Sequence, residues 1–227
     1  MPMRTLLVDA WKAWNIHSGW IVWNLFLAFI PLALSVWLFR RKSRSRSILW
    51  WVGFLVFIAF LPNAPYLLTD IIHLIKAIRD YYSVWIITLV LIPPHLFAII
   101  AGFEAYVISL INLGYYLHRQ GVGKFIIWTE LMTHALCAVG VYLGRFKRFN
   151  SWDFITQPDD LARSVLNDLT EKRPVLVIVI TFVVITVLYW MMKQVTLGLV
   201  LRMRQARAGG TDSGENSDTD TDTSTVL

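Results

Sequence analysis

Long apolar stretches separated by short polar segments dominate the chain. The first predicted crossing covers residues 20–39, and a second apolar run starts at residue 48. Further apolar runs cover residues 84–117, 125–143 and 175–192. Each complete run is at least as long as the roughly 17 residues that the shortest membrane-crossing helices use. The pattern therefore predicts an all-α, polytopic transmembrane helical bundle.

The second apolar run is interrupted by two prolines, Pro62 and Pro65. Each lacks a backbone donor and disfavours a helical conformation at the preceding residue, so the helix from Ile48 should end just before Pro62. A second helix should then start, with Asn63 or Ala64 as its cap and Pro65 in its first turn. Because the first piece is only about 21 Å long, the break should lie at membrane depth.

The third apolar run, residues 84–117, extends about 50 Å, which is too long for one straight crossing. Its Pro93-Pro94 pair permits a kink or a re-entrant start, so the run could be one crossing or two. Whether this run crosses once or twice, eleven Lys and Arg residues lie inside and ten outside. The distribution of positive charge therefore does not distinguish the two topologies. We choose five crossings over six because only five place residues 144–153 beside the polar segment after the break.

The basic segment that follows the first crossing, residues 40–46, carries five positive charges in a very short loop. Such loops stay in the cytoplasm, so the N-terminus should lie outside the cell membrane and the C-terminus inside. Residues 1–18 should form an interfacial helix, 19–193 the bundle and 194–208 a basic juxtamembrane segment. Residues 209–227, rich in Asp, Ser, Thr and Gly, should be a disordered acidic tail.

Polar side chains gather in two segments next to the crossings. Asp70 and His73 lie three residues apart on one face of the helix after the break, and Asp80 continues that face. Ionisable groups at membrane depth usually mark function, although this pair could equally cap and pair at the interface. The loop 144–173 should contain a short amphipathic helix at residues 161–169.

Two motifs also resemble those of a known family. They are Phe60-Leu-Pro-Asn-Ala-Pro-Tyr-Leu-Leu-Thr-Asp-Ile-Ile-His-Leu74 and the pair Gly140-Val-Tyr-Leu-Gly-Arg145 and Phe149-Asn-Ser-Trp-Asp153. Together they resemble the signature of the prokaryotic integral-membrane family catalogued as domain of unknown function 1361. The resemblance covers about residues 23–190. It implies a multi-pass membrane fold and assigns no chemistry.

Composition and motif searches narrow the function classes. The chain is 56% hydrophobic and 16% charged, with 11 tryptophans, which is typical of a membrane protein. The net charge of +6 lies in short clusters beside apolar runs, so membrane lipids are expected partners and nucleic acid is not. Cys137 is the only cysteine, which excludes a disulfide framework. No phosphate-binding loop or nucleophile elbow is present, so no cofactor is predicted, and the oligomeric state stays open.

Four ionisable side chains lie inside predicted crossings: His95 and Glu104 in the third, and Glu130 and His134 in the fourth. They would either form a proton or cation relay or pair with one another to hold helices together, and pairing is favoured. Some of them, with the acid and histidine after the break, could ligate zinc. No His-Glu-x-x-His run is present, so no metal site is predicted.

The leading functional hypothesis is a binding or transport module. The helix start at Asn63, with Arg145 and Arg148, would hold an anionic group such as a lipid headgroup or a small solute's carboxylate on the outward side. An unpaired Asp70 near the low-dielectric boundary would be costly, so Arg145 or Arg148 should lie within ion-pair reach of it.

Two alternatives remain open, and the sequence does not settle whether the chain is an enzyme. One is a membrane-embedded enzyme acting on a lipid-linked or envelope substrate, with His73 as a general base oriented by Asp70 and Asp153. That hypothesis lacks an evident nucleophile. The other is a structural or assembly protein whose polar motifs only attach loops to the bundle.

Overall fold

The structure, a computed structural model, describes residues 3–41, 46–79, 83–147 and 172–215, together with Thr156, Asp159 and Arg163. Among these residues every regular element is helical, and none is a strand. Five helices are long and apolar enough to cross a membrane: Val8–Arg40, Ile48–Lys76, Val84–Arg119, Gly123–Lys147 and Lys172–Ala206. The prediction of an all-α bundle with five spans is confirmed.

The first helix, α1 (Met3–Ser35), continues directly into a π-helical turn, Val36–Arg40. Residues 1–18, predicted to form a helix of their own, are from Met3 onward the start of this same helix. Ala13 is buried in a small cluster with Ile86 and Leu91 of the third span. Contact with a neighbouring helix therefore covers part of this segment, which explains why the helix continues through it.

The second span breaks where the prolines predict. Helix α2 (Ile48–Phe60) begins after Ser47, whose Oγ accepts a hydrogen bond from the backbone of Trp50 at 3.3 Å. A turn at Leu61 and Pro62 follows, then α3 (Asn63–Tyr66), a 3-10 turn (Leu67–Asp70) and α4 (Ile71–Arg79). The break lies near the middle of the candidate span Ile48–Lys76. The predicted interruption is confirmed as a turn, but the predicted loss of helical conformation before each proline is wrong, because Leu61 has helical dihedral angles and Ala64 lies within α3.

The predicted cap of the second piece is wrong. The residue before α3 is Pro62, and no side chain caps this helix. The amide of Asn63 donates instead to the carbonyl of Phe60 at 2.9 Å, so it satisfies an acceptor at the end of α2. Pro65 does lie in the first turn of α3, as predicted.

The break can form because two neighbouring helices present glycines to it. A Cβ atom built on Gly140, in α7 (Ile126–Tyr142), would lie 2.7 Å from Cβ and 2.8 Å from Cγ of Pro62. A Cβ atom on Gly102, in α6 (Ile92–Arg119), would overlap the side chain of Leu67. At Gly140 the approach is closer than a side chain would permit, because the proline ring is rigid, whereas at Gly102 the end of the Leu67 side chain would have to move.

The third span is one continuous helical run. It consists of α5 (Val84–Ile86), a π-helical turn (Ile87–Leu91) and α6. Pro93 and Pro94 lie in the first turn of α6, directly after the π-helical turn, where Ile92 N donates to Ile87 O. The wider turn accommodates the two missing donors without ending the helix, so the run is one crossing.

The last two spans close the bundle. A 3-10 turn (Gly123–Phe125) leads into α7, which ends in a third π-helical turn, Leu143–Lys147. Helix α10 (Lys172–Glu215) is longer than the predicted crossing at residues 175–192, and it includes residues 209–215 of the predicted tail. Residues 216–227 lie outside the described residues, as does the amphipathic helix predicted at 161–169, apart from Arg163.

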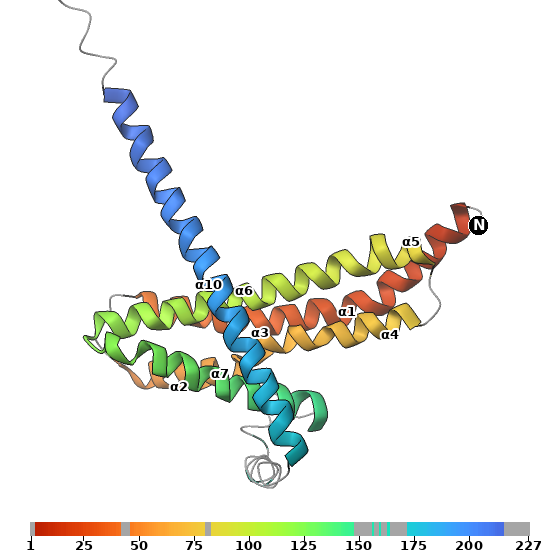
Figure 1. The fold of residues 1–227 in the computed structure, drawn as a ribbon, viewed down its shortest axis with the longest axis horizontal. Helices are drawn as coiled ribbons and strands as arrows, with labels where there is room; N and C mark the ends of the chain where they lie inside the picture. The colour runs from red at the N-terminus through yellow and green to blue at the C-terminus, as the bar shows by residue number, and fades with distance from the viewer. Residues whose placement is uncertain are drawn as a thin grey trace, which may run out of the picture.

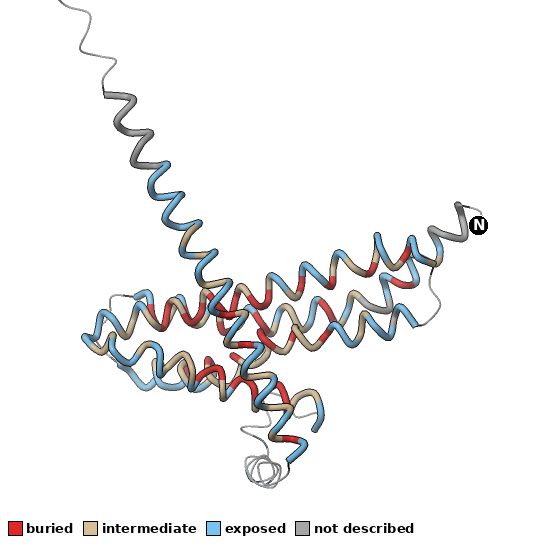
Figure 2. The backbone as a smooth tube through the Cα atoms, viewed as in Figure 1, coloured by how far each residue is buried: buried red, intermediate tan, exposed pale blue. Residues whose placement is uncertain are grey.

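Figure 1 shows α1, α4 and α6 side by side, whereas α10 crosses the bundle obliquely and extends beyond it. The core contains Phe39, Phe57, Phe103 and Tyr106, all at most 1% exposed. Figure 2 shows that the buried residues lie mostly where the helices run close together, and that α10 is mainly exposed where it leaves the bundle. Large apolar side chains cover the outside, and an exposed apolar surface of this extent is typical of membrane contact.

Candidate functional site

Asp70 is the centre of a polar cluster at the break. It ends the 3-10 turn, and its side chain is only 3% exposed. The amide of Asn24, on α1, donates to its Oδ2 at 3.1 Å. Nη2 of Arg145 lies 3.6 Å from its Oδ1, so the predicted ion pair between these two residues is present. A buried carboxylate thus receives one hydrogen bond and one opposite charge from two other helical segments.

Arg145 reaches the cluster from the π-helical turn at the end of α7. The wider turn shifts its side chain from the direction that a regular α-helix would give it. Nη1 donates to the hydroxyl of Tyr66 at 3.2 Å and lies 3.2 Å from Nε2 of His73, while Nη2 donates to the carbonyl of Thr69. The guanidinium Cζ also lies 5.2 Å from the centroid of the Tyr66 ring, in a cation–π contact. The break and the end of α7 therefore hold the guanidinium from several sides.

The ion pair nevertheless leaves hydrogen-bonding capacity unused. Asp70 Oδ1 and Arg145 Nε are buried, and in the described part of the chain neither atom makes a hydrogen bond. The second ion pair differs, because Lys193 Nζ lies 2.5 Å from Oε1 of Glu130 and the Tyr189 hydroxyl donates to the same oxygen at 2.7 Å. A buried pair repays its desolvation only with close geometry and satisfied polar atoms. We call the Asp70–Arg145 pair open, because its charged groups are 3.6 Å apart and each has a buried atom without a hydrogen bond in the described residues. The Glu130–Lys193 pair is closed, because its charged atoms are in direct contact.

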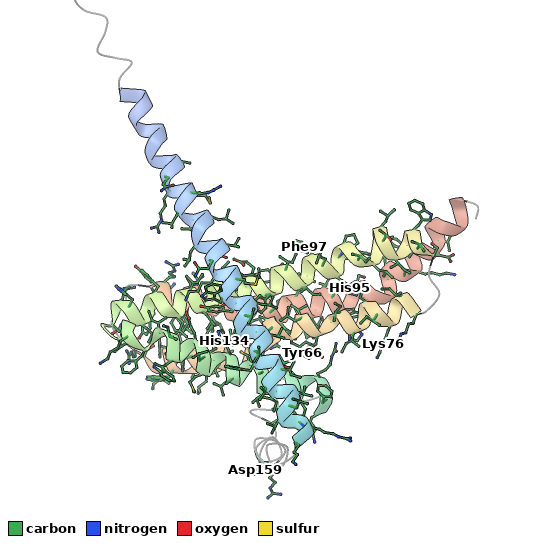
Figure 3. The ribbon with its side chains drawn as sticks, in the orientation of Figure 1. Tyr66, Lys76, His95, Phe97, His134 and Asp159 are labelled. Carbon is green, nitrogen blue, oxygen red and sulfur yellow. The ribbon has the colours of Figure 1, made fainter. Side chains whose placement is uncertain are left out.

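Two aromatic contacts extend the cluster towards the third span. The ring of Trp20, on α1, lies 4.5 Å from that of His73 and 5.2 Å from that of His95. His95 is 2% exposed, and its Nδ1 lies 2.7 Å from the carbonyl of Leu91, so Nδ1 carries the proton. Figure 3 labels Tyr66 and His95, which come from the break and from α6. His95, predicted as one of four ionisable groups inside the spans, thus lies close to this site.

The other ionisable groups of the spans contact helix α10 or its neighbours. Oε1 of Glu104 accepts a hydrogen bond from Thr196 at 2.6 Å, and Nδ1 of His134 lies 2.6 Å from the hydroxyl of Tyr106. The rings of His134 and Tyr189 are 4.6 Å apart, where α7 passes α10 (Figure 3). These contacts join α6, α7 and α10, but the partners are not among the four predicted groups, so they do not show the predicted pairing of those groups with one another. Lys193 and Thr196, the partners from α10, were not predicted.

Of the remaining predicted site residues, only Asn63 lies within the described ranges. The hydrogen bond from Asn63 runs to Phe60 at the break itself. Arg148, Asp153 and Asp80 lie outside the described residues. No group of three or more His, Cys, Asp or Glu side chains that could hold a metal ion occurs in the ranges that the structure describes.

Sequence analysis missed several residues of the cluster, although signals for some of them were available. Asn24 is the only amide in the apolar run 20–39, and polar side chains in such runs usually face another helix. Tyr66 and Thr69 follow three- and four-residue spacing with the predicted His73, which places them on the same face of a helical segment. Trp20 gave no signal, because tryptophan is common near membrane interfaces.

Comparison with known proteins gives one match. The model of a family described as "Protein of unknown function (DUF1361)" matches residues 23–187. The matched range includes the break and every residue of the cluster named above except Trp20. No curated protein and no solved structure matches the chain.

Proposed function

Since this chain belongs to the DUF1361 family, whose description assigns no function, we propose a function from the site itself: a membrane-embedded binding or transport module for an anionic group. Arg145 receives the anion, which is a lipid headgroup or the carboxylate or phosphate of a small solute. Asp70 is the internal counter-charge that holds the guanidinium between binding events.

The observation that carries this proposal is the open ion pair at the break. Guanidinium presents five donors in a planar fork, and it binds carboxylate or phosphate with two parallel hydrogen bonds. The terminal nitrogens of Arg145 are engaged, whereas Nε makes no hydrogen bond within the described residues. An anion can therefore bind along the edge formed by Nε and one terminal nitrogen. Asp70 at 3.6 Å is near enough to compensate the charge without occupying that edge.

Asp70 also couples the site to protons. While it is charged it competes with a bound anion for Arg145, and when it is neutral that competition disappears. Anion binding and proton uptake then favour each other, because linkage between two sites is reciprocal. Asn24 holds the other carboxylate oxygen in either state by rotating its amide.

The position of the site along the spans supports an outward-side location. Asn24 lies in the middle of the candidate span Val8–Arg40, whereas Asp70 and Arg145 lie near the ends of the candidate spans Ile48–Lys76 and Gly123–Lys147. Sites at broken helices are typical of transporters with alternating access. We assign the loop 40–46 and the C-terminus to the cytoplasmic side of the cell membrane.

The test measures anion-dependent thermal stability of the purified full chain in detergent. Acetate, inorganic phosphate and glycerol phosphate are compared with chloride at equal ionic strength, because a ligand of the native state raises Tm. The variant Asp70→Asn removes the competing charge and should show larger anion shifts than wild type. The exposed Asp159→Asn is the matched control and should behave as wild type.

The double variant Asp70→Asn/Arg145→Gln separates binding from a purely structural role. It removes both charges, so the protein should remain folded while the anion shifts disappear. If neither wild type nor Asp70→Asn responds to any anion more than to chloride, and the double variant is as stable as wild type, the pair is only structural. The enzyme hypothesis gains no support, because Nε2 of His73 accepts from Arg145 Nη1 and is engaged.

A further inference from the structure

A second polar cluster lies where the first, second and third spans meet, far in sequence from Asp70 and Arg145. Arg40 ends the first span, Arg46 precedes α2 and Arg119 ends α6, and all three side chains are exposed. They gather on two adjacent tyrosines of α6, Tyr115 and Tyr116. We call these five residues the arginine–tyrosine cluster.

Tyr115 carries two guanidinium groups. Cζ of Arg40 lies 4.8 Å from the centroid of its ring, and Cζ of Arg119 lies 5.7 Å from it. On the neighbouring residue, Arg46 Nε donates to the hydroxyl of Tyr116 at 3.0 Å, and the Arg46 Cζ lies 5.7 Å from the ring of Trp50. Tyr115 therefore holds two like charges against one ring, and the adjacent Tyr116 holds a third.

A buried hydrogen-bonded chain fixes the position of Arg40. Its Nε donates to Oδ1 of Asn112 at 2.6 Å, and Asn112 is 2% exposed. The amide of Asn112 donates in turn to the hydroxyl of Ser35 at 2.9 Å. No protein group in the described ranges accepts a hydrogen bond from the terminal nitrogens of Arg40 or Arg46, so these nitrogens remain available on exposed side chains.

No carboxylate balances these charges within the part of the chain that the structure describes. The ion pairs there join Asp70 with Arg145 and Glu130 with Lys193, and neither involves the cluster. Like charges held close together repel, and a bound anion relieves that repulsion. The cluster thus has fixed donors, exposure and an excess of positive charge, which is the chemistry of a phosphate site.

We propose that the arginine–tyrosine cluster binds a phosphate group, that of an anionic phospholipid headgroup in the adjacent leaflet. Apolar surface for the acyl chains is next to it, since Ile48 and Leu49, which follow Arg46 closely, are 84% and 65% exposed. Tyrosine and tryptophan at this level are typical of the membrane interface, and basic pockets between spans bind headgroups. A single lipid here would join the first three spans. This site does not depend on the anion proposed for Arg145.

The test counts lipids bound to the full chain by native mass spectrometry from detergent micelles. Wild type should bind dioleoyl phosphatidylglycerol more tightly than dioleoyl phosphatidylcholine, whose choline neutralises its phosphate. The double variant Arg40→Gln/Arg119→Gln removes two positive charges. Its affinity for phosphatidylglycerol should be about 25-fold lower, at about fivefold for each charge. The matched control is Arg202→Gln/Arg204→Gln, which removes two exposed charges from α10 and should change the affinity less than twofold.

Two further variants keep the outcome interpretable. Arg40→Lys/Arg119→Lys retains both charges but loses the planar guanidinium groups. If the phosphate is held by directed hydrogen bonds, this variant binds phosphatidylglycerol more weakly; if only general charge attraction acts, its affinity is unchanged. Arg119→Gln alone leaves the chain from Arg40 to Ser35 intact, so it should fold and bind about fivefold more weakly. The proposed site would be overturned by equal losses of lipid affinity in Arg40→Gln/Arg119→Gln and in the control Arg202→Gln/Arg204→Gln. Wild-type affinity in Arg40→Lys/Arg119→Lys would also overturn it.

Competition with inorganic phosphate distinguishes a lipid headgroup from a free phosphate anion as the ligand. Binding of phosphatidylglycerol that millimolar phosphate does not displace supports the headgroup assignment. Phosphate binding that depends on Arg119, with no preference for phosphatidylglycerol, overturns that assignment in favour of a free anion. Asp70→Asn/Arg145→Gln should bind phosphatidylglycerol as wild type does, which keeps this result separate from the site at the break.

Discussion

Replacing Gly140 by alanine tests whether close contact between α7 and the break holds the fold and the site together. The added Cβ would lie 2.7 and 2.8 Å from two ring carbons of Pro62. Carbon atoms pack best at about 3.5–4.0 Å, so α7 must withdraw by roughly 0.8 Å or more. A proline ring cannot rotate away as a flexible side chain does. Overpacking of this kind costs about 1–3 kcal/mol.

The gain in helix propensity opposes this cost and must be measured separately. Alanine in a helix interior is favoured over glycine by about 1 kcal/mol. Gly198→Ala in α10 is the matched control, because a Cβ atom there meets no atom within 4 Å. Gly140→Ala should therefore be less stable than Gly198→Ala by about 1–3 kcal/mol. The free energy of unfolding would be obtained from reversible denaturation by dodecyl sulfate in mixed micelles.

The same substitution should also weaken the proposed anion site. Arg145 lies on the continuation of α7, so withdrawal of the helix lengthens the already open contact with Asp70. Anion-dependent Tm shifts should then fall in Gly140→Ala and not in Gly198→Ala. Equal stability of the two variants, with unchanged anion shifts, would refute the argument that Gly140 sets the distance between α7 and the break.

Three further predictions concern other contacts. Asp70→Ala should destabilise the protein by about 3–5 kcal/mol because it leaves Arg145 buried without its partner, and Asp70→Ala/Arg145→Met should recover most of this in the same denaturation assay. Lys193→Met should loosen α10, because it leaves Glu130 uncompensated, and limited proteolysis should then cut α10 faster than in wild type. Green fluorescent protein fused after Leu227 should fluoresce and an alkaline phosphatase fusion at the same point should be inactive, since we assign the C-terminus to the cytoplasm.

The features that the sequence predicts well are those with a local cause. Pro62 and Pro65 lack the backbone donors that a regular helix needs, so the break after α2 is visible in the residues themselves, although Leu61 keeps helical dihedral angles. The pair of Asp70 and Arg145 is less local. It follows from the cost of a buried charge together with the choice of five spans, which places residues 144–153 beside Asp70.

The features that the sequence does not show depend on packing between distant segments. Asn24 and Asp70 meet only because α1 lies against the break, and Lys193 meets Glu130 only because α10 crosses α7. The continuity of the third span depends on a π-helical turn before Pro93, for which no residue pattern was available. Helix boundaries and partners of this kind are decided by tertiary contacts, which override local propensity.

The π-helical turns also have a consequence for the register of the chain. Each of these three turns, Val36–Arg40, Ile87–Leu91 and Leu143–Lys147, holds one residue more than the α-helical pattern would. The first and the third contain Arg40 and Arg145 of the two proposed sites. Deleting one residue from Leu143–Lys147 would restore a regular α-helix and rotate everything after it by about 100°. A homologue shortened by one residue at this turn would therefore have to supply its guanidinium from a different position.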